Sequence, residues 1–463
     1  MTDLGDNGST FEDLVLQLKT EIEALEQRTR ARSEEASEAF TSAVRHFVAE
    51  AWKGYKSVPP QESSIHLGRS HYSHTNRYAD QSLTYRQVKA AYDGLVGLGY
   101  IRQTHKGYYD PVKLQGRLTQ YVATQKLIDL LDNLKGSPAI AIGTDLEAET
   151  ILLRTKNEKR KLLVDYPDTP QTLKHRANLK EINACLSRHW LDLHVLDSEY
   201  DILAARITAD TQKQPIDFSK RTLVRIFSDP SFEHGGRFYR GWWQNIPSEY
   251  RKYLTIDTKP TVELDYSQLN PNILYALAGK ELGSVDAYDR VLNGNHRKLV
   301  KQAFNAMVQA KSGLKSKPET LDLSGTGLEW KDLRQAVLDA HQPISDYFFK
   351  GIGNKLQYED SCIAETVMLH FVKSDIPVYP VHDSFIMHHG YEDELKEQMN
   401  VAFQMRFKSD IEITVEPVDW TYLKSEQKSQ QPTVDDILNS LKPASLWHER
   451  NQQWFSRAKF KAV

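Results

Sequence analysis

The sequence contains very little cysteine, which excludes several classes of protein. Among 463 residues only Cys185 and Cys362 are cysteines. Two are too few for a disulfide framework or for a zinc site built from cysteines. Both are interpreted as small core residues rather than nucleophiles. This cysteine usage suits a reducing compartment, and a cytoplasmic location is expected.

The sequence also lacks long apolar runs and an excess of basic charge. No apolar run approaches the length that spans a bilayer, so no membrane partner is expected. The first residues, MTDLGDNGSTFEDL, lack the basic and apolar regions of a secretory signal. The formal net charge of -3 excludes a globally basic nucleic-acid binder. Any contact with phosphates must therefore come from local basic patches.

What is present is an ordinary globular composition in a long chain. Hydrophobic residues make up 40% and charged residues 26% of the sequence, which is typical of globular proteins. A chain of 463 residues exceeds what one hydrophobic core organises. Two or three domains are expected, although the sequence gives no indication of an oligomeric state.

The first part of the chain predicts a helix followed by a small mixed module. Apolar positions at Leu14, Leu18, Ile22 and Leu25 predict an amphipathic helix within residues 1–39. In the stretch LTYRQVKAAYDGLVGLGYIRQTHKGYYD, the pattern predicts a helix, a strand, a turn and a second strand. Thr84 is expected to cap the helix, Gly99 to end it, and Lys106-Gly107 to form the turn.

This pattern resembles a winged-helix module over residues 40–125. The resemblance implies contact with DNA, and its candidate nucleic-acid-binding residues are Arg86, Lys89 and Lys106. Residues 126–220 have a mostly helical period and are interpreted as a thumb-like region. Their basic run is interpreted as a solvated hairpin or helix face rather than a phosphate contact; it comprises Arg154, Lys156, Lys159, Arg160 and Lys161. Residues 423–463 are interpreted as a polar linker and a helical tail.

Two aspartates stand at predicted strand ends in the second half of the chain. In PTVELDYSQLNPNILYALAG, apolar residues alternate with Glu263 and Asp265 before a helix that begins near Pro271. In IPVYPVHDSFIMHH, two β-rich runs place His382 and Asp383 at a hairpin apex. Phosphoryl transfer by two metal ions needs carboxylates that bridge ions ~3.5 to 4 Å apart. The two aspartates would supply such ligands.

A predicted helix between the two aspartates carries a polar stripe. In HRKLVKQAFNAMVQAKSG, every fourth position is polar, and the other face is apolar through Val300, Phe304 and Met307. The stripe consists of Arg297, Lys301, Asn305 and Gln309. A guanidinium and an ammonium at its head suit a triphosphate. Standing alone, the same pattern would indicate a solvated helix face.

In this order and spacing, the three elements resemble the palm and fingers motifs of family A DNA polymerases and of single-subunit phage and mitochondrial RNA polymerases. DYSQLNPNILYALAGKELGSVDAY is similar to the first motif, including the pairing of Asp286 and Tyr288. RKLVKQAFN is similar to the fingers helix, and VHDSF to the third motif. Upstream, FEHGGRFY and IPSEYRKYL resemble segments that nominate Arg237 and Arg251. The resemblance covers about residues 220–415.

The resemblance implies an α+β fold and a set of roles. It implies a palm of antiparallel sheet and helices over residues 221–422, with fingers inserted at about 280–350. Two Mg²⁺ ions, which Mn²⁺ can replace, would be held by Asp265, Asp383 and Tyr266. Lys301 would act as catalytic residue beside the two aspartates, contacting the triphosphate and donating a proton to pyrophosphate. Nucleotide contacts would come from Arg297, Lys301, Asn305, Gln309, Tyr266 and Asn270. Contacts with a nucleic-acid template and primer would come from Arg237, Arg251, Gln268 and His382.

Several positions depart from the family pattern. Asn270 stands where the DNA polymerases carry a glutamate that excludes the ribose 2'-hydroxyl, and Ser384 replaces the acid that follows the third-motif aspartate. Asn305 and Gln309 replace an apolar or aromatic residue and a tyrosine. The product, DNA or RNA, is therefore left open. No acidic motifs of a proofreading exonuclease are evident in the first 220 residues.

The sequence thus indicates a template-directed polymerase that copies DNA from nucleoside triphosphates. An enzyme with so few domains would suit DNA replication in a mobile element or phage, or a phage-defence locus. One alternative is a template-independent nucleotidyltransferase. Another is a non-catalytic winged-helix replication initiator or regulator whose palm is a relic.

Overall fold

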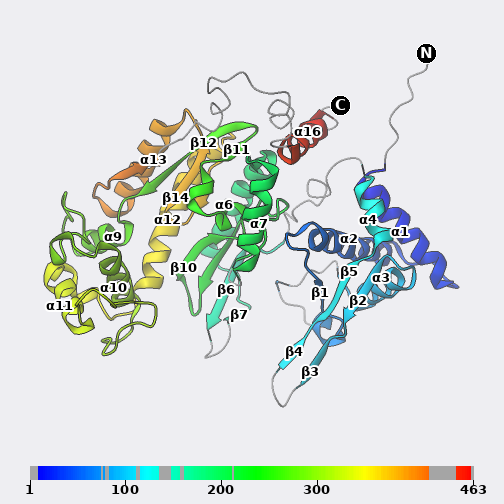
Figure 1. Cartoon of the computed structure of the whole chain (residues 1–463), viewed down its shortest axis with the longest axis horizontal. Coiled ribbons are helices and arrows are strands. Elements are labelled where there is room, and N and C mark those ends of the chain that lie inside the picture. Colours follow the sequence, from blue (N-terminus) through cyan, green and yellow to red (C-terminus); the bar gives the residue numbers. More distant parts are fainter. Residues whose placement is uncertain are drawn as a thin grey trace.

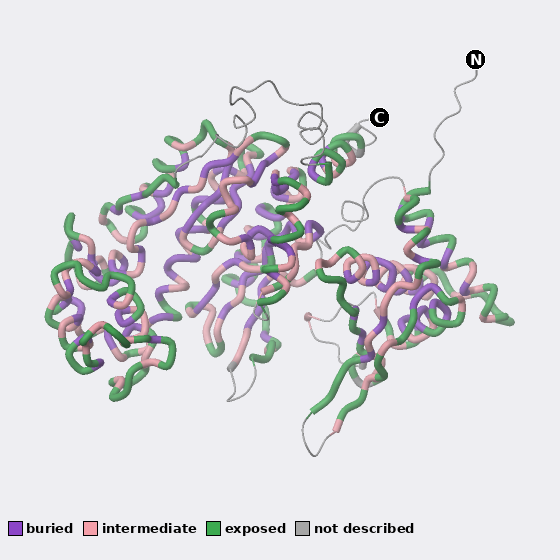
Figure 2. The backbone as a smooth tube through the Cα atoms, viewed as in Figure 1, coloured by how far each residue is buried: buried purple, intermediate pink, exposed green. Residues whose placement is uncertain are grey.

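The α+β class expected from the sequence is confirmed in a computed structural model of the chain, which combines helices with mainly antiparallel sheets. The structure describes residues 9–73, 77–78, 83–110, 115–134, 148–156, 161–210, 213–416 and 445–459. Buried side chains form two hydrophobic clusters, one from Phe11 to Leu131 and one from Ile151 to Ile413, and Trp52 packs against both (Figure 2). None of the helices in these ranges is long and apolar enough to cross a membrane.

The first cluster is built by four helices around a small antiparallel sheet (Figure 1). The helices are α1 (Phe11–Glu26), α2 (Glu34–Lys56), α3 (Tyr85–Gly97) and α4 (Gln125–Asp132). The strands, in spatial order, are β1 (Ser63–Ile65), β5 (Thr119–Ala123) and β2 (Ile101–His105). A Cβ added to Gly94 of α3 would lie 2.2 Å from the Ile22 side chain of α1. The predicted N-terminal helix is therefore packed into the next module rather than separate from it.

Details of the first predicted helices agree only in part with the structure. Leu14, Leu18 and Ile22 are buried as expected, whereas Leu25 is 50% exposed because α1 ends one residue later. Thr84 occupies the N-cap of α3 without a hydrogen bond from its side chain. Gly99 follows α3 with a φ of +72°, a conformation that suits glycine and ends the helix.

The turn predicted at Lys106-Gly107 is wrong. The chain continues from β2 into β3 (Tyr108–Asp110), which pairs with β4 (Gln115–Arg117), and β4 leads back into β5. Lys106-Gly107 therefore joins two strands that pair with different partners, and residues 111–114 lie outside the described residues. A Cβ on Gly107 would lie 2.7 Å from the Thr119 nitrogen, so this glycine permits close approach of two strands. The β3–β4 ribbon projects from the module (Figure 1).

The region predicted as helical, 126–220, contains three strands as well as helices. Strand β6 (Ile151–Lys156) forms a hairpin with β7 (Lys161–Leu163) and pairs in parallel with β9 (Val224–Ser228). With β10 (Ser231–Tyr239) these strands form a sheet in the order β10-β9-β6-β7. The described helices of the region after α4 include α6 (Pro170–Arg188) and α7 (Asp197–Ala209). Arg154, Lys156 and Lys161 of the basic run lie on β6 and β7, and Lys159 and Arg160 are outside the described ranges.

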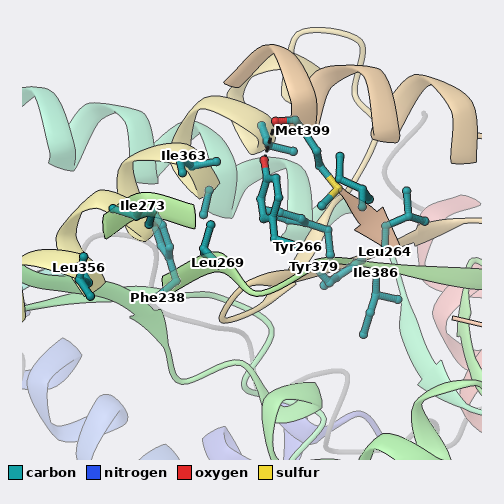
Figure 3. Close-up of a cluster of buried hydrophobic side chains, with 14 of the residues drawn as sticks. Phe238, Leu264, Tyr266, Leu269, Ile273, Leu356, Ile363, Tyr379, Ile386 and Met399 are labelled. Carbon is teal, nitrogen blue, oxygen red and sulfur yellow. Dashed lines mark hydrogen bonds between the residues drawn. The ribbon is translucent and has the colours of Figure 1, made fainter. Parts of the chain in front are cut away.

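The sheet that carries the candidate site is centred on β12 (Lys259–Tyr266). Its main path runs β13-β14-β12-β11-β8, and β15 also pairs with β12. The other strands are β8 (Leu191–Leu193), β11 (Leu254–Ile256), β13 (Tyr379–Val381), β14 (Ser384–His388) and β15 (Ile413–Val415). Helix α13 (Glu392–Phe407) packs on β12 and β15, and helices α9 (Leu269–Leu277) and α12 (Gly353–Val372) pack against α13. Figure 3 shows Leu264, Tyr266 and Met399 within the resulting apolar cluster.

The remaining elements flank this sheet. Helices α10 (Arg297–Gln309) and α11 (Trp330–Ala340) form a helical lobe beside α9 (Figure 1). Shorter helical segments are Arg69–Ser73, Trp242–Asn245, Ser248–Arg251, Leu292–Gly294 and Gln342–Tyr347. The last helix, α16 (Ser445–Lys459), docks on β8, where Arg450 forms an ion pair of 2.7 Å with the buried Asp192.

Candidate active site

Asp265 is held at the end of the central strand. Along β12, Val262, Leu264 and Tyr266 are buried, and Glu263 and Asp265 occupy the alternate, less buried positions, as the sequence predicted. Asp265 pairs with Ser384 of β14 on one edge and with Thr414 of β15 on the other. Since both edges of the strand are paired, the backbone of Asp265 is fixed.

Asp383 lies in the turn between β13 and β14, where the sequence placed it. His382 precedes it with a φ of +59°, the left-handed conformation that lets the chain reverse in two residues. The Tyr266 amide donates a hydrogen bond of 3.3 Å to the Asp383 carbonyl. The two predicted catalytic aspartates therefore come from adjacent strand ends.

The carboxyl of Asp265 is in an environment that disfavours its charge. Burial raises its pKa to about 7, the charges of Asp383 and Glu263 add to this effect, and Lys301 opposes it. The Oδ1 atom of Asp265 is buried and makes no hydrogen bond among the described residues. Clustered carboxylates with an unpartnered oxygen fit a divalent cation, which would stabilise both charges.

The number of protein ligands suits magnesium bound together with a substrate. Within the described ranges, only Cys185, His189 and Asp375 place three potential ligand atoms within 4.8 Å of one another. Asp265 and Asp383 thus offer a pair of ligands rather than a three-ligand cage. Mg²⁺ in phosphoryl-transfer sites commonly takes one or two carboxylates and completes its shell with phosphates and water.

The basic head of α10 faces the aspartates. The side chain of Lys301 is exposed and lies close enough to Asp265 to lower its pKa. Arg297 donates to Asp286 over 2.6 Å. Both cations lie near the ring of Tyr288, with Arg297 Cζ 5.4 Å and Lys301 Nζ 5.9 Å from its centroid. Burial and the charge of Asp286 raise the pKa of Tyr288 and Asp383 adds to this effect, so the ring lies near Asp383 as well as near the two cations.

The polar residues of the α10 stripe have different neighbours along the helix. Asn305 accepts a hydrogen bond of 3.3 Å from Asn270 of α9, so these two departures from the family pattern lie together. Gln309 lies at the far end, where a Cβ on Gly353 of α12 would come within 2.2 Å of its side chain. Gln268 accepts a hydrogen bond from the Ala287 amide. Its side chain thereby ties α9 to the segment before α10.

Tyr266 differs from its predicted role. Its side chain is buried on the face of β12 opposite Asp265, and its hydroxyl donates to the Met399 carbonyl over 2.7 Å (Figure 3). The phenol is therefore not available to a nucleotide or a metal ion. Only the main chain of Tyr266 lies beside the aspartates.

A buried acid, Asp360 of α12, was missed by sequence reasoning. Its carboxylate is 3% exposed and forms an ion pair of 2.5 Å with Arg237 of β10. Burial raises the pKa of Asp360 to about 7, with Arg237 opposing and Asp383 adding to the effect. The signal in the sequence was an acid four residues after Leu356, within an apolar helical face. Beside it, His382 packs edge-on against Tyr239, at 5.9 Å between ring centroids.

A second missed acid, Glu263, organises the other side of the site. It forms a bidentate ion pair with Arg251, at 2.7 and 2.8 Å, and accepts a hydrogen bond from Ser384. Arg251, expected to contact nucleic acid, is therefore already engaged by a carboxylate. Arg251, Glu263 and Glu416 line a cavity of about 360 Å³. In the sequence, the alternation of Glu263 with Asp265 was the signal that both side chains lie on the same face of the strand.

The nucleic-acid candidates of the first module lie on a different hydrophobic cluster. Arg86 of α3 is exposed and, with Arg28 and Arg30, lines a cavity of about 480 Å³. Lys89 forms an ion pair with Asp93 one turn along the same helix. Lys106 is exposed between β2 and β3. These residues are separate from the aspartate site.

Comparison with known proteins adds little to this geometry. No family model matches the chain, and no curated protein matches it. Among solved structures, the chain is similar to the POL domain of Pol1 from M. smegmatis in complex with DNA primer-template and dNTP, at 12% identity and a TM-score of 0.31. The similarity spans 88% of this chain and 66% of that one, just under two thirds of its length. A TM-score this low does not establish a shared fold.

Proposed function

We propose that the chain is a template-directed nucleic-acid polymerase in which Asp265 and Asp383 bind Mg²⁺. The observation that carries this proposal is the convergence of Asp265, Asp383 and Lys301 from three distant segments. The buried Oδ1 of Asp265 lacks a hydrogen-bond partner among the described residues, and its pKa responds to both other side chains. Metal ions bound there would stabilise the attacking 3'-hydroxyl and the leaving pyrophosphate.

The chain's own groups have distinct tasks in this proposal. Asp265, held between two strands, and Asp383, at the hairpin apex, orient the reacting phosphate. Lys301 and Arg297 approach from α10 and neutralise the triphosphate, and Lys301 donates a proton to the leaving group. Arg297 must exchange its contact with Asp286 for a phosphate, which makes its position responsive to nucleotide. Asn270 and Asn305 form one hydrogen-bonded pair at the edge of this site.

The arrangement of the first module supports a winged helix that contacts DNA. Helix α2, strand β1, helix α3 and strands β2 and β5 follow one another, with β5 between the other two strands. The β3–β4 ribbon then serves as the wing. The proposed phosphate contacts of the module are Arg86 and Lys89 on α3 and Lys106 between β2 and β3. DNA is accordingly proposed as the template.

Primer extension tests the proposal directly. The full chain is offered a primed DNA or RNA template with deoxynucleotides or with ribonucleotides, and the products are sequenced. Asp383→Asn is expected to lose incorporation, whereas Asp201→Asn, which removes an exposed carboxylate from α7, retains it. Circular dichroism verifies that both variants are folded. Wild-type activity in Asp383→Asn contradicts the metal assignment, and incorporation that ignores the template sequence contradicts template-directed synthesis.

A further inference from the structure

A group of metal-binding side chains lies away from the palm aspartates, where the ends of two helices meet. Cys185 and His189 are one turn apart at the end of α6, and Asp375 follows the end of α12. Their sulfur, ring nitrogen and carboxylate oxygen all lie within 4.8 Å of one another. A thiolate, an imidazole and a carboxylate are the ligand types that zinc prefers.

A second observation concerns the orientation of the His189 ring. Its Nδ1 lies 2.6 Å from Oδ2 of Asp257, in the tight turn between β11 and β12. Oδ1 of Asp257 accepts a hydrogen bond of 2.9 Å from the Trp190 amide, so the carboxylate is itself held in place. Nε2 consequently faces Asp375. A histidine that ligates a metal through one nitrogen commonly donates its other N–H to a carboxylate in this way.

We propose that Cys185 Sγ, His189 Nε2 and the Asp375 carboxylate bind a divalent transition metal of the zinc class. Water would complete a tetrahedral shell on the side of Asp375, whose side chain is exposed. Tetrahedral ligand atoms around zinc lie roughly 3.3 to 3.8 Å apart. In the structure the three ligand atoms lie at most 4.8 Å from one another, so metal binding would shorten these distances by about 1 Å. The count of two cysteines excludes an all-cysteine site but not this mixed one.

Two existing contacts are compatible with this site. Both hydrogen bonds from Arg188 reach Oδ1 of Asp375, the oxygen that also lies 3.7 Å from His189 Nε2, so a bound metal would share Oδ1 with Arg188 or bind Oδ2. His189 Nε2 lies 3.0 Å from the Asp375 carbonyl and exchanges this contact for the metal. Metal ligands bind in their deprotonated forms, so metal affinity should increase with pH.

The proposed role is structural. The metal would join the ends of α6 and α12 next to the β11–β12 turn, and these elements carry or support β12 and Asp360. No step of the proposed polymerase reaction passes through it. The soft sulfur ligand distinguishes this site from the oxygen-only magnesium site of the palm.

Cobalt(II) titration of the full chain tests the proposal, because a cobalt–thiolate bond gives a near-ultraviolet charge-transfer band. An Asp265→Asn/Asp383→Asn background removes the palm ligands. There we expect the band to saturate at one equivalent and to disappear when zinc is added. Cys362→Ser, which removes the other cysteine, keeps the band, and Cys185→Ser loses it. Absence of the band from the folded background chain, or its survival in Cys185→Ser, overturns the proposal.

Two further variants keep the test informative if Cys185→Ser does not fold. Asp375→Asn changes an exposed ligand, and Asp257→Asn changes a residue that holds the His189 ring without being a ligand. Each is expected to weaken cobalt binding, Asp257→Asn by about 10- to 100-fold. Cobalt affinities equal to that of the background chain in both variants overturn the proposal.

Discussion

Ser384 donates a hydrogen bond to Glu263 across the β12–β14 strand pair. In the family that the sequence resembles, the position of Ser384 carries an acid. Here a carboxylate reaches the same place from the neighbouring strand and is held there by Arg251. A negative charge therefore lies beside the two aspartates, although the residue that follows Asp383 is a serine.

Replacing Glu263 by Gln tests this relationship. Glu263 contributes to the raised pKa of Asp265, so the variant should ionise Asp265 at lower pH. The acidic limb of the pH–activity profile is expected to move down by under about one unit. Ser384→Ala, which keeps the charge of Glu263, serves as control and should move the limb less. An unchanged profile in Glu263→Gln would show that its charge does not reach the site.

The raised pKa of Asp265 predicts how stability depends on pH without divalent ions. The folded carboxyl holds its proton until about pH 7, whereas the ordinary pKa of an aspartate is 3.8. Between these values the folded state binds more protons, so the free energy of unfolding falls as pH rises. The loss attributable to Asp265 is up to about 4 kcal/mol. Urea unfolding from pH 4 to 8 should show a smaller decline in Asp265→Asn.

Magnesium should reverse part of this decline. At pH 8 the ion stabilises the ionised carboxylates, so it is expected to raise the melting temperature of the wild type. The same concentration should have less effect on Asp265→Asn and less effect at pH 5.5. Equal stabilisation of wild type and variant at pH 8 would place the bound ion elsewhere.

The buried pair of Arg237 and Asp360 predicts strong coupling between two substitutions. Arg237→Ala leaves the Asp360 carboxylate buried without its cation and should cost about 3 to 5 kcal/mol at pH 8. The cost should be smaller at pH 6, because Asp360, with a pKa of about 7, is then protonated. Arg237→Ala/Asp360→Asn should recover part of the loss. Additive effects in a double-mutant cycle would contradict this interpretation.

The projecting ribbon predicts a separable contribution to DNA binding. Tyr108 and Tyr109 of β3 are 60% and 66% exposed, so replacing both by Ala should leave the melting temperature unchanged and weaken duplex binding. Lys106→Ala should reduce the salt dependence of binding by about one phosphate contact. Fluorescence anisotropy at several salt concentrations measures both effects. Lys396→Ala, on the exposed face of α13, is the matched control.

Tyr266→Phe separates packing from nucleotide contact. The change removes the hydrogen bond to the Met399 carbonyl and should cost about 1 kcal/mol of stability. The KM for nucleotide should stay the same, because the phenol points away from the aspartates. A raised KM with unchanged stability would restore a direct role to the side chain.

The sequence was informative where local patterns suffice. Alternation along residues 262–266 predicted the strand and the position of Asp265, and helical spacing predicted the buried face of α10. It failed where pairing is distant. The three residues of β8 are all buried, including Asp192, and their partner strand β11 lies about 60 residues along the chain. The place of Asp360 beside the site likewise could not be predicted from local pattern, because its partners Arg237 and Asp383 are distant in the sequence.

The double pairing of Asp265 has a consequence for the order of events during synthesis. One neighbour, Ser384, is made 119 residues later and the other, Thr414, 149 residues later. A ribosome-bound chain therefore exposes Asp265 on an unfinished strand until both neighbouring strands have emerged. Long-range closure of this kind is slow. Onset of the proposed activity would consequently report completion of the sheet rather than synthesis of Asp265 and Asp383.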